Sequence, residues 1–181
     1  VGTIYGAAFD AKSENLYMAA FLKRHAGLGP EGIGAIYVHT DGDPNTSAPL
    51  FYDFGAAAGI VADNATRFPE DGDAFGEEGP CGTCDNIDPT TFGQVGKAGF
   101  GDIEVNPENT HLYVTNLYDR KVYMISLDNP TANSATPLPA MPWLDNSVCS
   151  NGIARPWALE FRRGKLYVGV ICDGSLGSCT P

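Results

Sequence analysis

An internal repeat constrains the fold of this chain more than any other feature. A Leu-Tyr pair opens an apolar segment at three places, Leu16-Tyr17, Leu112-Tyr113 and Leu166-Tyr167. Each pair follows a short polar turn, and each turn follows a segment of alternating hydrophobicity. Repetition of one supersecondary unit predicts that neighbouring units bury a common core between them.

The repeated unit has the pattern of a β-hairpin. In the segment before each turn, apolar residues stand at every second position, which places them on one face of a strand. These residues are Ala7 and Phe9, Ile103 and Val105, and Leu159 and Phe161. The turns at 10–15, 106–111 and 162–165 carry Asp, Asn, Pro and Gly, which favour tight turns. The Leu-Tyr segments are apolar on both faces, so we expect them to be buried between layers.

Two of the units continue into further strands. Third strands are expected at 35–38 and 121–127, and a fourth, outer strand at 50–54. A weaker outer strand is expected at 136–144, where three prolines suit only a sheet edge. Four antiparallel strands in a repeated unit are typical of a propeller blade. We therefore predict an all-β fold, a partial β-propeller of antiparallel four-stranded blades with a loop-rich insertion.

The repeat predicts one partial propeller over residues 1–181. Blade 1 is expected at 1–54, an insertion at 55–98, blade 2 at 99–147 and the start of a third blade at 148–181. The insertion is rich in Gly, Asp and Pro, which favours loops over the alternative of a degenerate blade. Propellers close with about 4 to 8 blades. We therefore expect a fragment of a longer protein, or a subunit whose ring other copies complete.

The charge of the chain excludes some partners. Asp and Glu number 22 against 11 Lys and Arg, and the net charge is −11. Such a surface disfavours nucleic acid and anionic lipid. Apolar runs are shorter than the ~18 residues of a membrane helix, so no membrane insertion is expected. The expected partners are a second copy or the remainder of a longer chain, with a glycan as a further candidate.

Five cysteines in an acidic, lysine-poor chain favour an oxidising compartment, so we expect an extracellular or cell-surface location. Cys149 precedes the third hairpin and Cys172 ends it, so a disulfide between them is expected to stabilise the fold by about 3 kcal/mol. Pairing of Cys172 with Cys179 is the alternative. Cys81 and Cys84 form a CxxC, which we interpret as a local disulfide, with metal binding or free thiols as alternatives.

Acidic loops are candidate calcium sites. Asp41 and Asp43 lie in one loop, and Glu70, Asp71 and Asp73 in another. Calcium takes about 6 to 8 oxygen ligands, and glycines in both loops allow sharp turns. The alternative is a pair of solvated loops. Calcium is the one cofactor that the sequence suggests.

Three further carboxylates, Asp102, Glu104 and Glu160, stand on first strands, which line the central channel of a propeller. They are candidates for a channel metal or for ion pairs with Arg155, Arg162 or Arg163. A catalytic residue is not expected, because no Ser or Cys nucleophile can be matched to a His base and Gly-x-Ser-x-Gly is absent.

Two stretches carry a family resemblance. Residues 100–105 with 112–123, and 153–159 with 164–169, resemble blades in the propeller-like region of large bacterial exported and cell-surface proteins. In those mostly uncharacterised proteins this region often precedes Cna-B or SD-repeat adhesin domains. The resemblance implies a propeller fold and an exported location.

These observations lead to one expected function and two alternatives. We expect a non-catalytic extracellular structural or binding module of a bacterial surface or secreted protein. The blade pattern is also similar to enzymatic propellers, so a calcium-dependent hydrolase of the lactonase type is one alternative. A carbohydrate-binding propeller is the other.

Overall fold

The computed structural model describes residues 2–23, 26–40, 47–59, 93–131, 134–139, 141 and 148–175. Within these residues the chain forms ten β-strands and two short 3-10 helices, η1 (Gly32–Gly34) and η2 (Gly55–Ala58). The strands are β1 (Ile4–Asp10), β2 (Asn15–Ala20), β3 (Ala35–His39), β4 (Leu50–Asp53), β5 (Phe100–Val105), β6 (His111–Asn116), β7 (Lys121–Ser126), β8 (Thr136–Pro137), β9 (Ala154–Arg162) and β10 (Lys165–Cys172).

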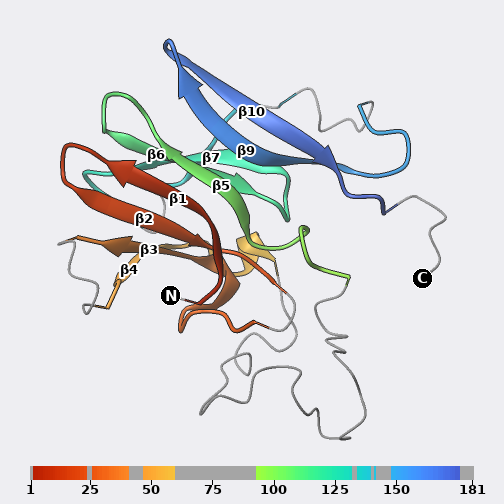
Figure 1. Cartoon of the computed structure of the whole chain (residues 1–181), viewed down its shortest axis with the longest axis horizontal. Coiled ribbons are helices and arrows are strands. Elements are labelled where there is room, and N and C mark those ends of the chain that lie inside the picture. The colour runs from red at the N-terminus through yellow and green to blue at the C-terminus, as the bar shows by residue number, and fades with distance from the viewer. Residues whose placement is uncertain are drawn as a thin grey trace, which may run out of the picture.

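The strands form two four-stranded sheets and one hairpin. The sheet orders are β1-β2-β3-β4 and β5-β6-β7-β8, and β9 pairs with β10. Every pairing is antiparallel, so each unit is a meander of neighbouring strands (Figure 1). The predicted all-β class with antiparallel sheets is confirmed. No closed barrel or closed ring of sheets is seen among the residues that the structure describes.

The three hairpins share one register. In each repeat the last or second-to-last residue of the first strand pairs with the Leu of the Leu-Tyr motif: Phe9 with Leu16, Val105 with Leu112, and Phe161 with Leu166. Each hairpin also carries a register shift farther from the turn, at 4–7 in β1, at 100–103 in β5 and opposite 169–170 in β9. A shift of this kind bends and twists a strand. The repeat in the sequence is therefore a repeat of backbone geometry.

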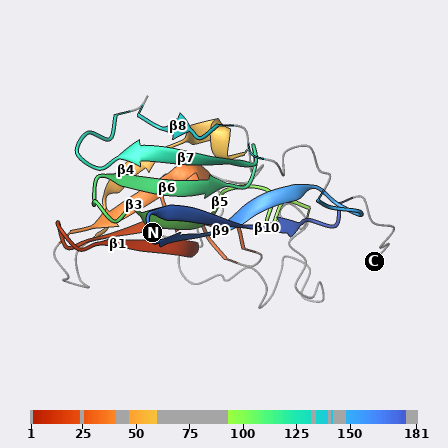
Figure 2. The same cartoon turned by 90° about the horizontal axis from the view of Figure 1, so that it is seen from above.

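The three units are stacked in chain order. β5 lies against β1 on one side and against β9 on the other, so the first strands of the units are neighbours (Figure 1). Seen from above, β1 and β9 lie at one side of the stack, and β7 and β8 lie at the other (Figure 2). This arrangement places an interface between the first and second sheets and another between the second sheet and the third hairpin.

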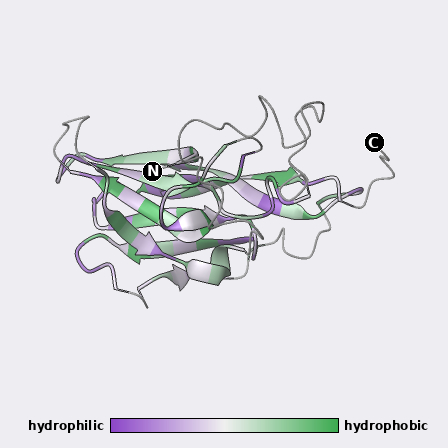
Figure 3. Cartoon of the chain, turned by 90° about the horizontal axis from the view of Figure 1, so that it is seen from below, coloured by the Kyte–Doolittle hydropathy of each residue, from purple (hydrophilic) through white to green (hydrophobic). Residues whose placement is uncertain are grey.

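The main core lies between the first two sheets. Its members alternate along the strands, as the period of two predicts. The buried cluster comprises Ala8, Tyr17, Ala19, Ile36, Tyr52, Ala58, Phe100, Ile103, Val105, Leu112, Val114 and Ile125. A second cluster, formed by Val122, Cys149, Ala154 and Leu159, lies between the second sheet and the third hairpin. Hydrophobic residues accordingly gather on the strands, and hydrophilic residues gather in the turns (Figure 3).

The outer strand expected at 136–144 is shorter in the structure. β8 spans only Thr136–Pro137, and Leu138, Pro139 and Met141 lie outside strands. The Leu138 N–H still donates to the Val122 carbonyl oxygen at 2.9 Å. Because proline has no N–H to donate, the ladder cannot extend through this segment.

Candidate interaction surface

Each repeat has two faces that can be defined by their neighbours. We call the forward face of a repeat the one that points toward the following repeat, and the rear face the opposite one. The forward faces are formed by Gly6, Ala8, Tyr17 and Ala19 in β1–β2, by Asp102, Glu104, Tyr113 and Thr115 in β5–β6, and by Ala158, Glu160, Tyr167 and Gly169 in β9–β10. Shared register makes the members of these three sets equivalent by position.

The forward faces of the first two repeats are covered. Tyr17 is 2% exposed and lies in the core against the second sheet. Tyr113 is half-buried, and its ring packs edge-on against Phe161 of β9, with 5.0 Å between the ring centroids. The tyrosine of the Leu-Tyr motif thus serves as a contact to the next repeat.

The forward face of the third hairpin is uncovered. Tyr167 is 54% exposed and Ile171 is 39% exposed. Ala158, Glu160 and Gly169 are exposed as well. The expectation that every Leu-Tyr strand is buried on both faces is therefore wrong for β10, because no described residue packs on its forward side. An apolar face left open at the end of a stack is a candidate interaction surface.

Glycines allow the first strands to approach one another closely. A Cβ atom at Gly6 would lie 2.7 Å from the Gly101 carbonyl oxygen of β5. A Cβ atom at Gly101 would lie 2.6 Å from the Trp157 carbonyl oxygen of β9. Both distances are shorter than any real contact of a Cβ atom allows. In the third hairpin, Ala158 and Gly169 keep the centre of the forward face similarly flat.

The opposite end of the stack also exposes apolar side chains. On the rear face of β1, Phe9 is 59% exposed, and Ile4 and Ala7 are exposed as well. Their equivalents in β5 are Val105, Phe100 and Ile103, which are buried against the first sheet. The two ends of the stack therefore differ in kind: one presents a forward face and the other a rear face.

The turn of the third hairpin is basic. Arg162, Arg163 and Lys165 are three of the 11 lysines and arginines in this acidic chain. Arg162 and Arg163 line a shallow pocket of about 370 Å³ together with Glu160 and Tyr167. The uncovered forward face thus has an apolar strip beside a positive turn.

Two of the predicted channel carboxylates, Asp102 and Glu104, lie on the face of β5 that meets β9, whereas Glu160 lies on the uncovered forward face of β9. Asp102 accepts hydrogen bonds from the Ile103 N–H and the Leu159 N–H, each at 3.0 Å, so this side chain ties the two first strands together. Burial raises the pKa of the Glu104 carboxyl, and the negative charges of Glu160 and Asp102 raise it further, while the Phe161 N–H lowers it. In the part of the chain that the structure describes, no group of three or more His, Cys, Asp or Glu side chains is placed to hold a metal ion.

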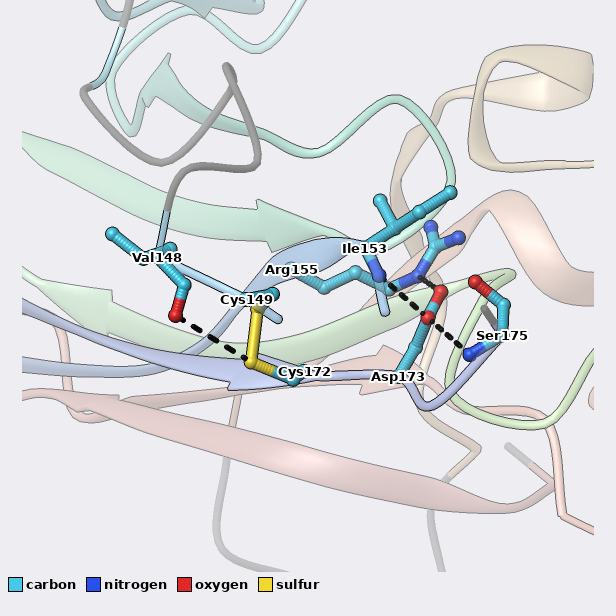
Figure 4. The surroundings of a disulfide bond; sticks show 7 residues. All are labelled: Val148, Cys149, Ile153, Arg155, Cys172, Asp173 and Ser175. Carbon is cyan, nitrogen blue, oxygen red and sulfur yellow. Dashed lines mark hydrogen bonds and ion pairs between the residues drawn. A yellow bond between two sulfur atoms is a disulfide. The ribbon is translucent and has the colours of Figure 1, made fainter. Parts of the chain in front are cut away.

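A disulfide and an ion pair hold the far end of the third hairpin. Cys149 is bonded to Cys172, with 5.7 Å between the Cα atoms (Figure 4). Beside it, the buried Arg155 side chain donates from Nε to Asp173 Oδ2 at 2.8 Å and from Nη1 to the Leu117 carbonyl oxygen. Arg155 therefore links the third hairpin to the second sheet.

The pairing of Arg155 with Asp173 differs from what the sequence pattern indicates. The pattern offers Arg155 as a partner of the channel carboxylates, but the guanidinium points toward Asp173 instead (Figure 4). Asp173 directly follows Cys172 in the chain, so the disulfide that the sequence suggested also positions the carboxylate. Its position next to Cys172 is the one feature of the sequence that points to Asp173 as the partner of Arg155.

Several predicted site residues lie outside the described residues. These are Cys81, Cys84, Asp41, Asp43, Glu70, Asp71 and Asp73. The local disulfide and the calcium loops therefore stay predictions. Among the helices that the structure describes, none is long and apolar enough to span a membrane.

The fold defines an all-β protein of stacked antiparallel sheets with one uncovered forward face. Over 96% of its length the chain is 27% identical to Colossin-D of Dictyostelium discoideum, of which it spans 17%. It is also 28% identical to Colossin-A of the same organism over 96% of its length, and spans 1% of that protein. The chain therefore spans a small part of the relatives that it matches. No family model and no solved structure matches it.

These relatives correct the expected function. A module of a bacterial surface or secreted protein was expected, but the matched proteins come from a eukaryote. The blade-like sequence pattern that suggested bacterial proteins is a pattern of strand alternation and turns. Such a pattern reports the fold of a segment and carries no information on the organism or the activity.

Proposed function

We propose that this region is a sheet-stacking unit within a longer extracellular polypeptide, and that a further antiparallel sheet covers its uncovered forward face. One observation carries the proposal. The motif tyrosine is buried by the following repeat at Tyr17, half-buried by the following repeat at Tyr113, and 54% exposed at Tyr167. A face with the same register and chemistry as two covered faces is suited to the same kind of cover.

The energetics favour such a cover. Burying an aromatic or large aliphatic side chain contributes about 1.5–3 kcal/mol. Covering Tyr167 and Ile171 would therefore stabilise the contact with another sheet by several times the thermal energy RT. The small residues Ala158 and Gly169 allow the close strand approach that Gly6 and Gly101 allow elsewhere in the stack.

A propeller is the architecture that we propose for the whole stack. Its first strands β1, β5 and β9 are neighbours, and successive sheets follow one another in chain order. Repeated antiparallel sheets around their first strands are how propeller blades are arranged. Further sheets of the same kind would extend the stack toward closure.

An extracellular setting is supported by the cysteine chemistry. Disulfides such as Cys149–Cys172 persist in oxidising compartments and are rare in reducing ones. A longer polypeptide is supported by the relatives, since the matched region is 17% of Colossin-D and 1% of Colossin-A.

The proposal can be tested by hydroxyl-radical footprinting. The reactivity of Tyr167 is compared between the 181-residue chain in dilute solution and the whole native polypeptide that contains it. We expect strong protection of Tyr167 in the whole polypeptide. Tyr118, which is 53% exposed and lies off both faces, serves as the matched control and should react equally in both. Equal reactivity of Tyr167 in the two samples would refute the proposal.

A further inference from the structure

We propose that the uncovered forward face of β9–β10 docks on the rear face of β1–β2 of a second copy, so that copies of this chain associate head to tail. This inference rests on the proposed function, because it takes the forward face to be a stacking surface. It adds the identity of one partner that the chain itself can supply.

The interfaces inside the molecule set the rule for this contact. The forward face of the first sheet is covered by the rear face of the second, and the forward face of the second sheet is covered by the rear face of the third hairpin. A forward face therefore always meets a rear face. Among the described residues, the rear face that remains uncovered is that of β1, with Leu16 and Met18 of β2 partly exposed beside it, whereas Ala20 at the end of β2 is buried.

The chemistry of this rear face matches the rule. Val105 and Ile103 of β5 fill the first interface from the rear side. At the equivalent positions of β1 stand Phe9 and Ala7, both exposed. A second copy would thus offer Phe9 to the strip formed by Tyr167 and Ile171. Offset or edge-on contact of two aromatic rings adds about 0.5–1.5 kcal/mol to the area that they bury.

The turns would also come together in this contact. In the first interface the turns of successive repeats lie side by side, since Ser13 of the first turn and Asn109 of the second line one pocket. The same offset would place the basic turn 162–165 of one copy beside the turn 10–15 of the next, where Glu14 and Lys12 are exposed and Asp10 is buried. Opposite charges at a rim mainly set the register and speed the association.

Head-to-tail contacts between identical chains are heterologous. They use two different surfaces, so they leave one free surface at each end and build chains or closed rings. A dimer formed by two identical faces would behave differently. This difference makes the proposal testable with variants that block one face each.

The test uses Tyr167→Lys to block the forward face and Phe9→Lys to block the rear face. Both side chains are exposed, so neither change removes core packing. Tyr118→Lys is the matched control, because it makes the same substitution at an equally exposed tyrosine off both faces. The urea midpoint of each variant verifies folding. If either variant is misfolded, Ile171→Lys or Ile4→Lys replaces it on the same face.

Sedimentation equilibrium over a range of concentrations provides the readout. We expect the unchanged chain and Tyr118→Lys to increase in average mass with concentration. Each blocked variant by itself should stay monomeric, with self-association weakened at least about tenfold. An equimolar mixture of Phe9→Lys and Tyr167→Lys should form a dimer, because one variant keeps its forward face and the other its rear face.

Three results would overturn the proposal. They are a monomeric unchanged chain at all concentrations, continued self-association of either blocked variant by itself, and absence of a dimer in the mixture. A monomeric unchanged chain would leave the proposed function intact if Tyr167 is still protected in the whole polypeptide. Equal reactivity of Tyr167 there would instead refute the proposed function itself.

Discussion

Single glycines set the distance between the repeats. Gly6 and Gly101 stand at the register shifts of β1 and β5, where the backbone of the next first strand leaves no room for a Cβ atom. Neither glycine has a positive φ, so steric contact explains their presence and backbone conformation does not. At both positions the absence of a side chain is what allows the first strands to approach one another.

Replacing Gly6 with Ala should therefore destabilise the chain. The added methyl group would meet backbone atoms of β5, which cannot move away as a flexible side chain can. Forcing one methyl group into a packed interface costs about 1–3 kcal/mol. The measurement is the free energy of unfolding in urea. Gly93→Ala is the control, since a Cβ atom there meets nothing within 4 Å, and it should leave the stability nearly unchanged.

An unchanged stability of Gly6→Ala would mean that the first strands are farther apart than described.

The alternation of apolar residues on these strands was predictable from the sequence, because a period of two is a local property. The role of the glycines was not, because the close approach is made between strands that are far apart in the chain.

The end of the third hairpin shows how one element is fixed to its neighbours. Burial by itself raises the pKa of the Asp173 carboxyl, but hydrogen bonds from Ser175, from the Ile153 N–H and from Arg155 outweigh it. Together they hold the pKa of Asp173 well below its ordinary value. The charged form is therefore favoured by folding.

This shift predicts acid sensitivity with a definite sign. A carboxyl whose pKa is lower in the folded chain contributes stability above its unfolded pKa of about 4 and loses it as the pH falls further. The urea midpoint of the unchanged chain should therefore exceed that of Asp173→Asn at pH 7, and the difference should shrink below about pH 4. A difference that stays constant down to about pH 3 would show that the charge of Asp173 does not stabilise the hairpin.

For the third hairpin, the sequence predicted some of the contacts that the structure shows and not others. It suggested the hairpin and the closeness of Cys149 and Cys172, because both follow from antiparallel pairing over a short stretch. It did not suggest the Arg155 contact to the Leu117 carbonyl oxygen, because that contact joins two different sheets. It also predicted a longer outer strand than β8, because a blade has four strands and this segment stands where the fourth is expected, although its prolines cannot donate to a strand ladder.

For the molecule as a whole, the repeat predicted the stacked sheets, and the structure adds direction to them. Each repeat covers its predecessor, so the first repeat exposes a rear face and the third exposes a forward face. The sequence could not reveal this, because Tyr17, Tyr113 and Tyr167 look identical in their local patterns. Their different exposure depends on what packs against each one: the following repeat covers the forward faces of Tyr17 and Tyr113, and Phe51 of the same sheet also contacts Tyr17.

One measurement tests this account most directly, namely the stability cost of truncating the three equivalent tyrosines. In urea unfolding at low concentration, Tyr17→Ala should cost about 3 kcal/mol or more, as for other buried aromatic residues. Tyr113→Ala should cost less, and Tyr167→Ala about 0.5 kcal/mol or less, as for exposed positions. If Tyr167→Ala instead costs as much as Tyr17→Ala, the third hairpin already has a cover and the directional stack is wrong.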